Sequence, residues 1–210
     1  WIQAYAKDAQ EALDMALIAY AVAEDARIMT PVMVNLDGFA LTHTYETVDI
    51  PTSEEADAFL PPYQTSNRFD FENPTNMAFS AGPAYNRYFK QSEHIDMLRT
   101  SEVLADVEKR FADIVGRQWP GMIETWGCDD AGVVVLGSVA GLACEVAEHL
   151  RQQGRAVGVV RIRYLRPMPA AEIVAALSGA QAIGVLEKDI SFGAEGTVFT
   201  NVSSALFNAG

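Results

Sequence analysis

The sequence predicts an α/β fold in which helices cover both faces of a mainly parallel sheet. This expectation rests on the second half of the chain, where short β-branched runs alternate with amphipathic stretches across short connections. Half of the 210 residues are hydrophobic and a fifth are charged, a composition typical of a globular protein. The length suffices for one or two domains with a hydrophobic core.

The chain is expected to open with a helix near Asp8, because Asp8 and Glu11 have the spacing of a capping box. The apolar stripe of this helix is predicted to comprise Leu13, Ala16, Leu17 and Tyr20. An apolar run at 31–36 follows and is closed by Asp37-Gly38. Its β-branched content predicts a buried strand that ends in a turn.

Composition changes between Glu46 and Pro83, where prolines and acidic residues interrupt any regular period. Aromatic residues are spaced along this stretch, which distinguishes it from a Gly/Ser linker. We expect a proline-stiffened connector whose aromatic rings are buried against the folded domain or a partner. A disordered acidic connector is the alternative. The aromatic residues are Phe59, Tyr63, Phe69, Phe71 and Phe79.

A long second helix is predicted from Gln91 to about Gly116, because apolar residues recur there at helical spacing. Its stripe comprises Ile95, Leu98, Val103, Leu104, Val107, Phe111 and Ile114. Strands and helices then alternate to residue 210, which indicates the mainly parallel sheet. The expected strands are 122–126, 133–136, 157–164 and 182–187, the last of them buried, and the expected helices are 140–153, 169–177 and 197–208.

The charge balance and the cysteine count argue against several classes of function. There are 15 basic and 28 acidic residues, a net charge of −13, whereas binding nucleic acid requires clustered Lys and Arg. No uncharged run reaches the roughly 18 to 20 residues that span a bilayer. The two cysteines, Cys128 and Cys144, provide neither a disulfide framework nor the four thiolates of an iron–sulfur site. We therefore expect no nucleic-acid or membrane partner, no bound metal, and a reducing, cytoplasmic setting.

Polar residues and glycines gather at 189–196, directly after the last predicted strand. Open α/β sheets place ligands and partner contacts at the carboxyl ends of their strands. One interpretation is a functional loop; the other is a polar connection in which Ser191 or Glu195 caps the final helix. The candidate residues are Asp189, Ser191, Gly193 and Glu195.

A second polar corner follows the strand predicted at 31–36 and contains Asp37, Thr42 and His43. Two interpretations remain open for His43: a general base, or a structural histidine, because no paired nucleophile is evident. The segment 137–141 carries glycines between a predicted strand and a helix, but it matches only part of the dinucleotide-binding fingerprint. A tight strand-to-helix turn is the favoured interpretation there.

Several motifs follow one another along essentially the whole chain. They are Pro31-Val-Met-Val-Asn-Leu-Asp-Gly-Phe39 with Thr42-His43, Phe59-Leu-Pro-Pro-Tyr63, Ala81-Gly-Pro83, Leu165-Arg-Pro-Met-Pro169 and Asp189-Ile-Ser-Phe-Gly193-Ala-Glu-Gly196. Together they resemble the alpha subunit of the pyruvate:ferredoxin oxidoreductase family. By this resemblance, residues 1–45 are the tail of a pyrimidine-type thiamine diphosphate domain. Residues 46–118 are a connector with one helix, and 119–210 form a transketolase carboxy-terminal-like domain.

The resemblance implies a reaction of a whole complex: reversible oxidative decarboxylation of pyruvate with coenzyme A, giving acetyl-CoA, CO2 and reduced ferredoxin. Thiamine diphosphate, iron–sulfur clusters and coenzyme A would act in that complex, whose other subunits bind the thiamine and carry the clusters. The family's substrate-facing residues fall upstream of Trp1, and we read the chain as a piece of a longer polypeptide. No catalytic residue is therefore assigned, and this chain alone is expected to bind none of these cofactors and to be inactive.

Two alternatives stay open. The chain is a non-catalytic interaction module, or it belongs to the same enzyme class acting on 2-oxoisovalerate or 2-oxoglutarate. Under the oxidoreductase interpretation, the residues of the two polar corners lie at an interface or beside the active site.

Overall fold

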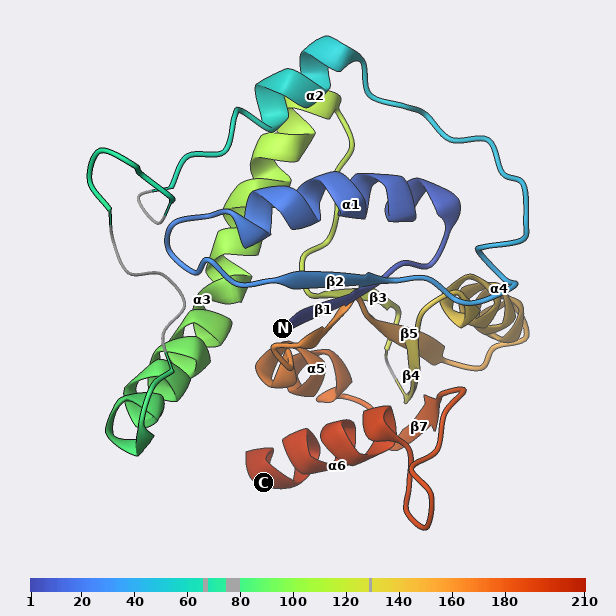
Figure 1. Cartoon of the computed structure of the whole chain (residues 1–210). Coiled ribbons are helices and arrows are strands. Elements are labelled where there is room, and N and C mark those ends of the chain that lie inside the picture. The colour runs from blue at the N-terminus through green and yellow to red at the C-terminus, as the bar shows by residue number, and fades with distance from the viewer. Residues whose placement is uncertain (66–67, 75–79, 129) are drawn as a thin grey trace.

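The computed structural model describes residues 1–65, 68–74, 80–128 and 130–210, and their strands form two sheets (Figure 1). The first sheet has the order β2-β1-β6, and the second has the order β3-β5-β4-β7. The strands are β1 Ile2–Tyr5, β2 Val32–Asn35, β3 Ile123–Trp126, β4 Ala131–Leu136, β5 Val157–Ile162, β6 Tyr164–Arg166 and β7 Ala182–Leu186. β1 was not foreseen, because its four residues carry too short a pattern.

Helix α1, Ala9–Ala23, packs on the first sheet and begins where the sequence predicts. The side chain of Asp8 accepts a hydrogen bond from the backbone N–H of Glu11 at 2.8 Å, which confirms the predicted N-terminus. The predicted apolar stripe was only partly correct: Leu17 packs on the core, but Tyr20 is 63% exposed. The buried face also carries Glu11, Met15 and Ile18. The prediction failed because apolar spacing alone cannot show that a charged residue such as Glu11 faces the core.

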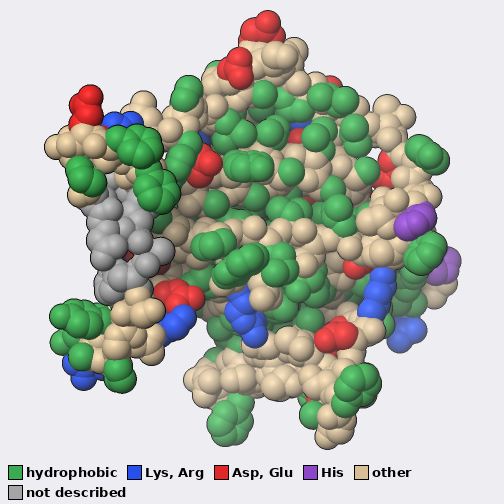
Figure 2. Space-filling model, viewed as in Figure 1, with side chains coloured by type: hydrophobic (Ala, Val, Ile, Leu, Met, Phe, Trp, Pro, Cys, Tyr) green, Lys and Arg blue, Asp and Glu red, His purple; other side chains and the backbone are tan. Residues whose placement is uncertain are grey.

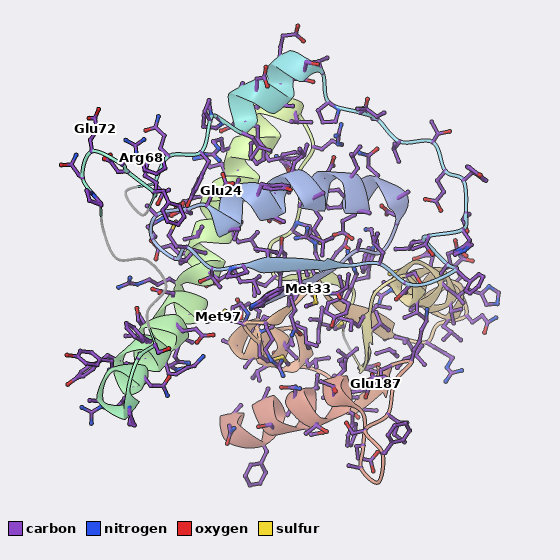
Figure 3. All side chains as sticks on the ribbon, in the orientation of Figure 1. Glu24, Met33, Arg68, Glu72, Met97 and Glu187 are labelled. Carbon is purple, nitrogen blue, oxygen red and sulfur yellow. The ribbon has the colours of Figure 1, made fainter. Side chains whose placement is uncertain are left out.

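Strand β2 is an edge strand within the described part of the chain. It runs parallel to β1 and pairs with no other described strand. Met33, labelled in Figure 3, is 40% exposed, and Leu36 is 45% exposed. The expectation of a buried strand at 31–36 was therefore wrong for this chain, although the strand itself and its turn were correct.

The connector contains a helix that the sequence reading missed, α2 at Ser53–Phe59. A capping box between Thr52 and Glu55 begins it, with the Thr52 hydroxyl accepting from the Glu55 N–H at 3.2 Å. Phe59 is fully buried and meets Phe111 edge to face, with 5.1 Å between ring centroids. This anchor was correctly predicted, but the proline-rich composition obscured the helix.

The next three connector aromatics are half or largely exposed in this chain. Tyr63 is 49% exposed, Phe69 81% and Phe71 97%, so their predicted burial against the folded domain was wrong. Burial against a partner stays a prediction. Phe79 lies outside the described residues.

Helix α3, Pro83–Val115, starts eight residues before the predicted Gln91. It ends at Gly116, whose φ of 80° is the left-handed conformation common after helices. The predicted stripe is buried only in the C-terminal half. Leu98 is 62% exposed, because the N-terminal half projects away from the body (Figure 1). The buried members of the stripe are Val103, Leu104, Val107 and Phe111.

The second sheet confirms the predicted architecture. β4 pairs in parallel with β5 and β7, and only β3 runs antiparallel. Val135 packs on one face with α4, Val139–Gln152, whereas Val134 packs on the other face with α5, Ala170–Leu177, and α6, Thr197–Ala209. The predicted strand 157–164 divides: its last part enters β6, which pairs with β1. One continuous chain segment thus joins the two sheets.

Strand β7 is largely exposed in this chain. Ile183 is 38% exposed and Leu186 is 47% exposed. The expectation of a buried strand at 182–187 was therefore wrong for the chain as described.

Candidate functional site

One residue from each of the two polar corners that the sequence singled out lines a cavity of about 440 Å³. It lies between the sheets, where β1, β4 and β7 reach their carboxyl ends, a usual place for ligands in open α/β sheets. Asp37 and Asp189 both line it. The other lining residues are Gln3, Tyr5, Leu136, Leu165, Glu187, Lys188, Thr197 and Val198.

Asp37 connects the loop after β2 to the N-terminal end of α4. Its Oδ2 accepts hydrogen bonds from the backbone N–H of Ser138 at 2.7 Å, from the Ser138 hydroxyl, and from Lys188 Nζ at 3.1 Å. Burial raises the pKa of this carboxyl, but the hydrogen bonds from Ser138 and Lys188 outweigh it and hold the pKa below its usual value. Asp37 therefore carries a negative charge that is already paired.

The Asp37 carboxylate lies directly against Gly137, in the turn before α4. Gly137 has φ 71°, and a Cβ at this position would lie 2.9 Å from Asp37 Oδ2. The N-terminus of α4 could otherwise bind a phosphate, but the Asp37 carboxylate already accepts the Ser138 N–H there. The interpretation as a tight strand-to-helix turn is thereby confirmed.

Glu187 holds the start of α6, where Figure 3 labels it. Its carboxylate accepts from the backbone N–H of Val198 at 2.8 Å and of Phe199 at 3.0 Å. A Cβ at Gly196 would overlap that carboxylate, so only glycine permits the approach. The expectation that Ser191 or Glu195 caps this helix was wrong.

Ser191 and Glu195 instead close the loop on itself. The Ser191 N–H donates to the Glu195 carbonyl at 3.4 Å, and both side chains are exposed. Gly193 between them has φ 79°, a conformation that favours glycine. Phe192 next to it is fully exposed.

Thr42 and His43 form a separate small cluster that does not line the cavity. The Thr42 hydroxyl accepts from the Phe39 N–H at 3.0 Å and lies 2.9 Å from His43 Nδ1. The Phe39 ring stacks on the imidazole at 4.3 Å between centroids, and Phe39 has φ 62°. The Thr42 hydroxyl beside this imidazole also accepts the Phe39 N–H within the same turn, which favours the structural interpretation of His43.

Sequence reasoning missed Lys188, Ser138 and Tyr5 as members of the site. The pKa of Tyr5 is raised by burial and by the nearby Asp189 carboxylate, so its hydroxyl keeps its proton. Lys188 carried a usable signal: it lies between Glu187 and Asp189 in a run of charges directly after a strand. Tyr5 carried none, because it lies in an unforeseen strand.

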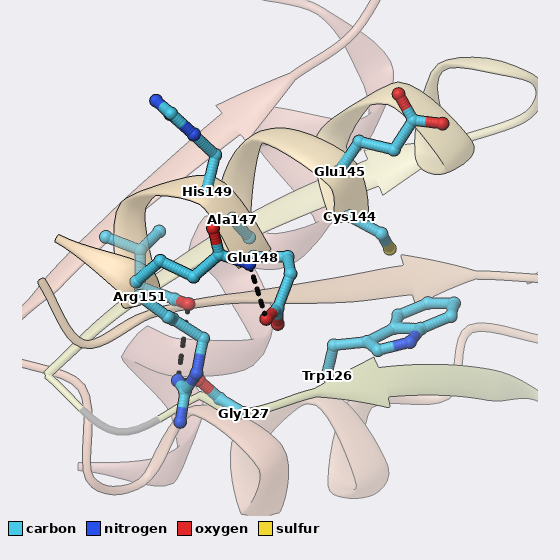
Figure 4. A pocket seen from close by; sticks show the side chains of 10 residues that line it. Trp126, Gly127, Cys144, Glu145, Ala147, Glu148, His149 and Arg151 are labelled. Atoms are coloured by element: carbon cyan, nitrogen blue, oxygen red, sulfur yellow. Dashed lines mark hydrogen bonds between the residues drawn. The ribbon is translucent and has the colours of Figure 1, made fainter. Parts of the chain in front are cut away.

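A second cavity of about 620 Å³ lies between the end of β3 and α4 (Figure 4). Arg151 reaches across it and donates from Nη1 to the carbonyl of Gly127 at 2.8 Å. Burial raises the pKa of the Cys144 thiol to about 11, which keeps this thiol protonated and a poor nucleophile. The cavity contains none of the sequence-predicted site residues.

The strand-end cavity does not fit a thiamine diphosphate, and the cysteines of the chain do not fit an iron–sulfur cluster. Three carboxylates and one ammonium line the strand-end cavity, an excess of negative charge that would repel a diphosphate. Two cysteines fall short of the four thiolates of a [4Fe–4S] cluster. Within the described ranges, no group of three or more His, Cys, Asp and Glu has metal-binding geometry.

Hydrophobic side chains cover much of the face in Figure 2, with charged side chains scattered between them. In the part of the chain that the structure describes, however, every helix is too short or too polar to cross a membrane.

Comparison with known proteins extends over nearly the whole chain. Pyruvate synthase subunit PorA of Methanothermobacter thermautotrophicus is 38% identical over 208 residues, 98% of this chain and 54% of that protein. Ketoisovalerate oxidoreductase subunit VorA of Pyrococcus horikoshii is 37% identical, over 100% of this chain and 54% of that protein. The chain thus spans about half the length of the curated relatives it matches.

A solved 2-oxoglutarate:ferredoxin oxidoreductase from Magnetococcus marinus, with 2-oxoglutarate, coenzyme A and succinyl-CoA bound, shares the fold. Its TM-score is 0.56 at 16% identity, over 90% of this chain and 35% of that chain. Two family models also match. "Pyruvate:ferredoxin oxidoreductase core domain II" matches residues 130–209. "Pyruvate flavodoxin/ferredoxin oxidoreductase, thiamine diP-bdg" matches residues 1–109, more than half of the chain. The chain therefore belongs to the pyruvate:ferredoxin oxidoreductase family.

Proposed function

We propose that this chain is part of a cytoplasmic 2-oxoacid:ferredoxin oxidoreductase that oxidatively decarboxylates pyruvate. In the proposed reaction, pyruvate loses CO2, its acyl group passes to coenzyme A as a thioester, and the two electrons released reduce ferredoxin one at a time. The single observation that carries the proposal is the match to family models of this enzyme at both ends of one chain. Similarity to PorA proteins across the same range supports pyruvate as the substrate.

The role proposed for this part of the enzyme is to supply subunit contacts and a wall near the active site. The paired state of Asp37 supports it, because a carboxylate held by Ser138 and Lys188 fixes a junction and is not available for proton transfer. Asp189, Ser191, Gly193 and Glu195, together with Thr42 and His43, are proposed as interface or active-site-adjacent residues, because all six are exposed in this chain. Thiamine diphosphate, coenzyme A and iron–sulfur clusters would be held mainly by other parts of the complex.

The proposed domain division is 1–45, 46–118 and 119–210, with the last resembling the transketolase carboxy-terminal domain. The family matches, which end at 109 and resume at 130, support a break near the end of α3. Strand β6, in the proposed unit 119–210, pairs with β1, in the proposed unit 1–45. The last unit therefore contributes a strand to the sheet of the first unit.

The test is to purify the intact complex through a tag on this subunit and to measure viologen reduction with 2-oxoacids and coenzyme A. Pyruvate is expected to give the highest kcat/KM, with thiamine- and cluster-bearing subunits co-purifying. A complex that prefers 2-oxoisovalerate would establish the second candidate, which the similarity to VorA specifically favours. Full activity of this 210-residue chain by itself, or a complex inactive on every 2-oxoacid, would contradict the proposal.

A further inference from the structure

The N-terminal half of α3 projects from the body as an exposed helix (Figure 1). Every residue from Pro83 to Ile95 is exposed. Packing on the core begins at Met97, which Figure 3 labels. A helical segment of three to four turns gains little stability from its backbone alone and is normally held by an apolar face that packs on another surface. We therefore expect this half of α3 to have a packing partner.

Large apolar side chains follow one side of this half of the helix. Spacings of three and seven residues place them in one row, the pattern of helices that pair with another helix. We call them the exposed stripe of α3, and Figure 2 shows hydrophobic side chains gathered where this helix projects. Its members are Tyr85 (61% exposed), Tyr88 (57%), Ile95 (40%) and Leu98 (62%).

The opposite side of the same segment carries Asn86, Lys90 and Glu93, which are polar and exposed. Lys90 and Glu93 already pair with each other at 2.6 Å. The segment is thus amphipathic, although neither side packs on the core. A contiguous apolar surface of this kind is typical of a protein-interaction site.

Two charged residues lie beside the exposed stripe and determine which orientation of a second copy fits. They are Asp96 and Arg99, which face each other within the chain only at 4.0 Å. Parallel packing of two copies would place Asp96 near Asp96 and Arg99 near Arg99, and like charges at such positions repel. The charges therefore disfavour a parallel pair.

Antiparallel packing centred on Ser92 reverses this outcome. It places Arg99 opposite Tyr85 of the second copy, where a guanidinium can lie against an aromatic ring. It also places Asp96 opposite Tyr88 of the second copy. The Tyr88 hydroxyl accepts from Arg87 at 3.2 Å, so its own proton can be donated to that carboxylate. The charged residues and the aromatic residues of one stripe thus complement those of the other.

Ser92 suits the crossing point of two such helices. It lies seven residues from both Tyr85 and Arg99, and its side chain is smaller than either. The distance between packed helices depends on the side chains at their contact, so a small residue there permits close approach. At a two-fold axis a residue meets the same residue of the other copy.

We infer that the exposed stripe of α3 binds the exposed stripe of a second copy of this chain, in an antiparallel pair that crosses at Ser92. The same surface serves both copies, so the interface is closed and does not extend into a filament. The inference rests on the pattern and charges of α3 and does not depend on the proposed reaction.

The first test is disulfide cross-linking of the full-length subunit that carries Ser92→Cys, under mild oxidation. Serine and cysteine are nearly isosteric and position 92 is exposed, so this variant should fold like the native protein. A covalent dimer is expected on a non-reducing gel, because the two introduced thiols meet at the crossing. Lys90→Cys, on the opposite side of α3, is the control and should cross-link no more than the native protein. Absence of the Ser92→Cys dimer, equal cross-linking of the control, or cross-linking only to a different subunit would overturn the inference.

Sedimentation equilibrium of the full-length subunit gives a second measurement that needs no cross-link. Ile95→Asp is expected to raise the dissociation constant of the dimer at least about tenfold, because it places a charge in the apolar contact. His94→Asp introduces the same side chain one position away, outside the stripe, and should leave the constant nearly unchanged. Equal effects of the two variants, or a native subunit that stays monomeric at every concentration, would overturn the inference.

Discussion

Arg163 donates from Nε to Oε1 of Glu11 at 2.7 Å, and both side chains are fully buried. Arg161 also donates to Glu11, and Nη1 of Arg163 reaches Glu108 Oε1 at 2.8 Å. Glu11 lies in α1 and Glu108 in α3, whereas the arginines lie in β5 and just after it. The cluster therefore connects the helices on the first sheet to the second sheet. A buried charge that loses its partner is strongly destabilising.

The first prediction follows from that cost. Glu11→Gln leaves Arg161 and Arg163 short of their shared counter-charge and should reduce the free energy of unfolding by about 3–5 kcal/mol. Denaturant unfolding of the subunit measures this. The matched control is Glu145→Gln on the exposed face of α4, expected to change stability by less than about 0.5 kcal/mol. Equal effects for the two variants would show that the buried cluster does not stabilise the fold.

Acid should weaken the same cluster. Burial alone raises the pKa of Glu11, but Arg161 and Arg163 outweigh it and the folded-state pKa lies below the usual 4.5. A group with a depressed folded-state pKa contributes stability above its unfolded pKa and loses it as the pH falls through the folded value. The stability of the native protein should thus fall below about pH 4.5, and Glu11→Gln should flatten part of that slope. Parallel pH profiles for both proteins would refute this assignment.

Asp37 should matter for the junction between the two polar corners. Asp37→Asn removes the charge that Lys188 pairs with and weakens the bonds from Ser138, at an expected cost of about 1–2 kcal/mol. In a double-mutant cycle with Ser138→Ala, the two effects should be clearly non-additive, because the residues are in direct contact. Asp189→Asn, in the same cavity but exposed, is the control. Additive losses would indicate that the contact contributes nothing.

Substitutions of the connector aromatics can distinguish residues that pack within this chain from residues that pack only in the complex. Phe59→Ala should cost about 3–5 kcal/mol, because Phe59 is fully buried against Phe111. Phe71→Ala should be close to neutral in this chain, where Phe71 is 97% exposed. If Phe71 anchors to a partner, its amide region should become protected from exchange on assembly. Unchanged exchange in the assembled complex would exclude that anchor.

Patterns local in sequence predicted most of the fold. The alternation after residue 119 gave the parallel sheet, and the spacing of Asp8 and Glu11 gave the start of α1. The predictions failed where a residue distant in sequence determines whether a side chain is buried. Glu11 is buried because Arg161 and Arg163 reach it from 150 or more positions away, and no local pattern contains that pairing.

The candidate site, too, was predictable where the signal is local in sequence and not where it depends on tertiary contacts. Asp37 and Asp189 were predicted from their positions after strands, a local signal, and they do line one cavity. That Ser138 and Lys188 pair with Asp37 depends on how the two sheets pack. A turn residue and its partner across the fold are connected only by tertiary structure.

The last prediction concerns Gly193 in the loop between β7 and α6. Its φ of 79° is costly for a residue with a Cβ, by roughly 1–2 kcal/mol, and more for a β-branched one, although a Cβ there would meet nothing within 4 Å. Gly193→Val should therefore reshape the exposed loop while the sheet still folds, because the loop packs little on the body. If the loop borders another subunit, the variant complex should assemble poorly or turn over more slowly. Gly193→Asn is the matched control, since Asn tolerates the left-handed conformation. Analytical ultracentrifugation and steady-state turnover of both variant complexes provide the readout. If the Val variant assembles and turns over like the native complex, the loop has no role at a subunit interface. It would then only connect β7 to α6, with Glu187 bound at the start of that helix.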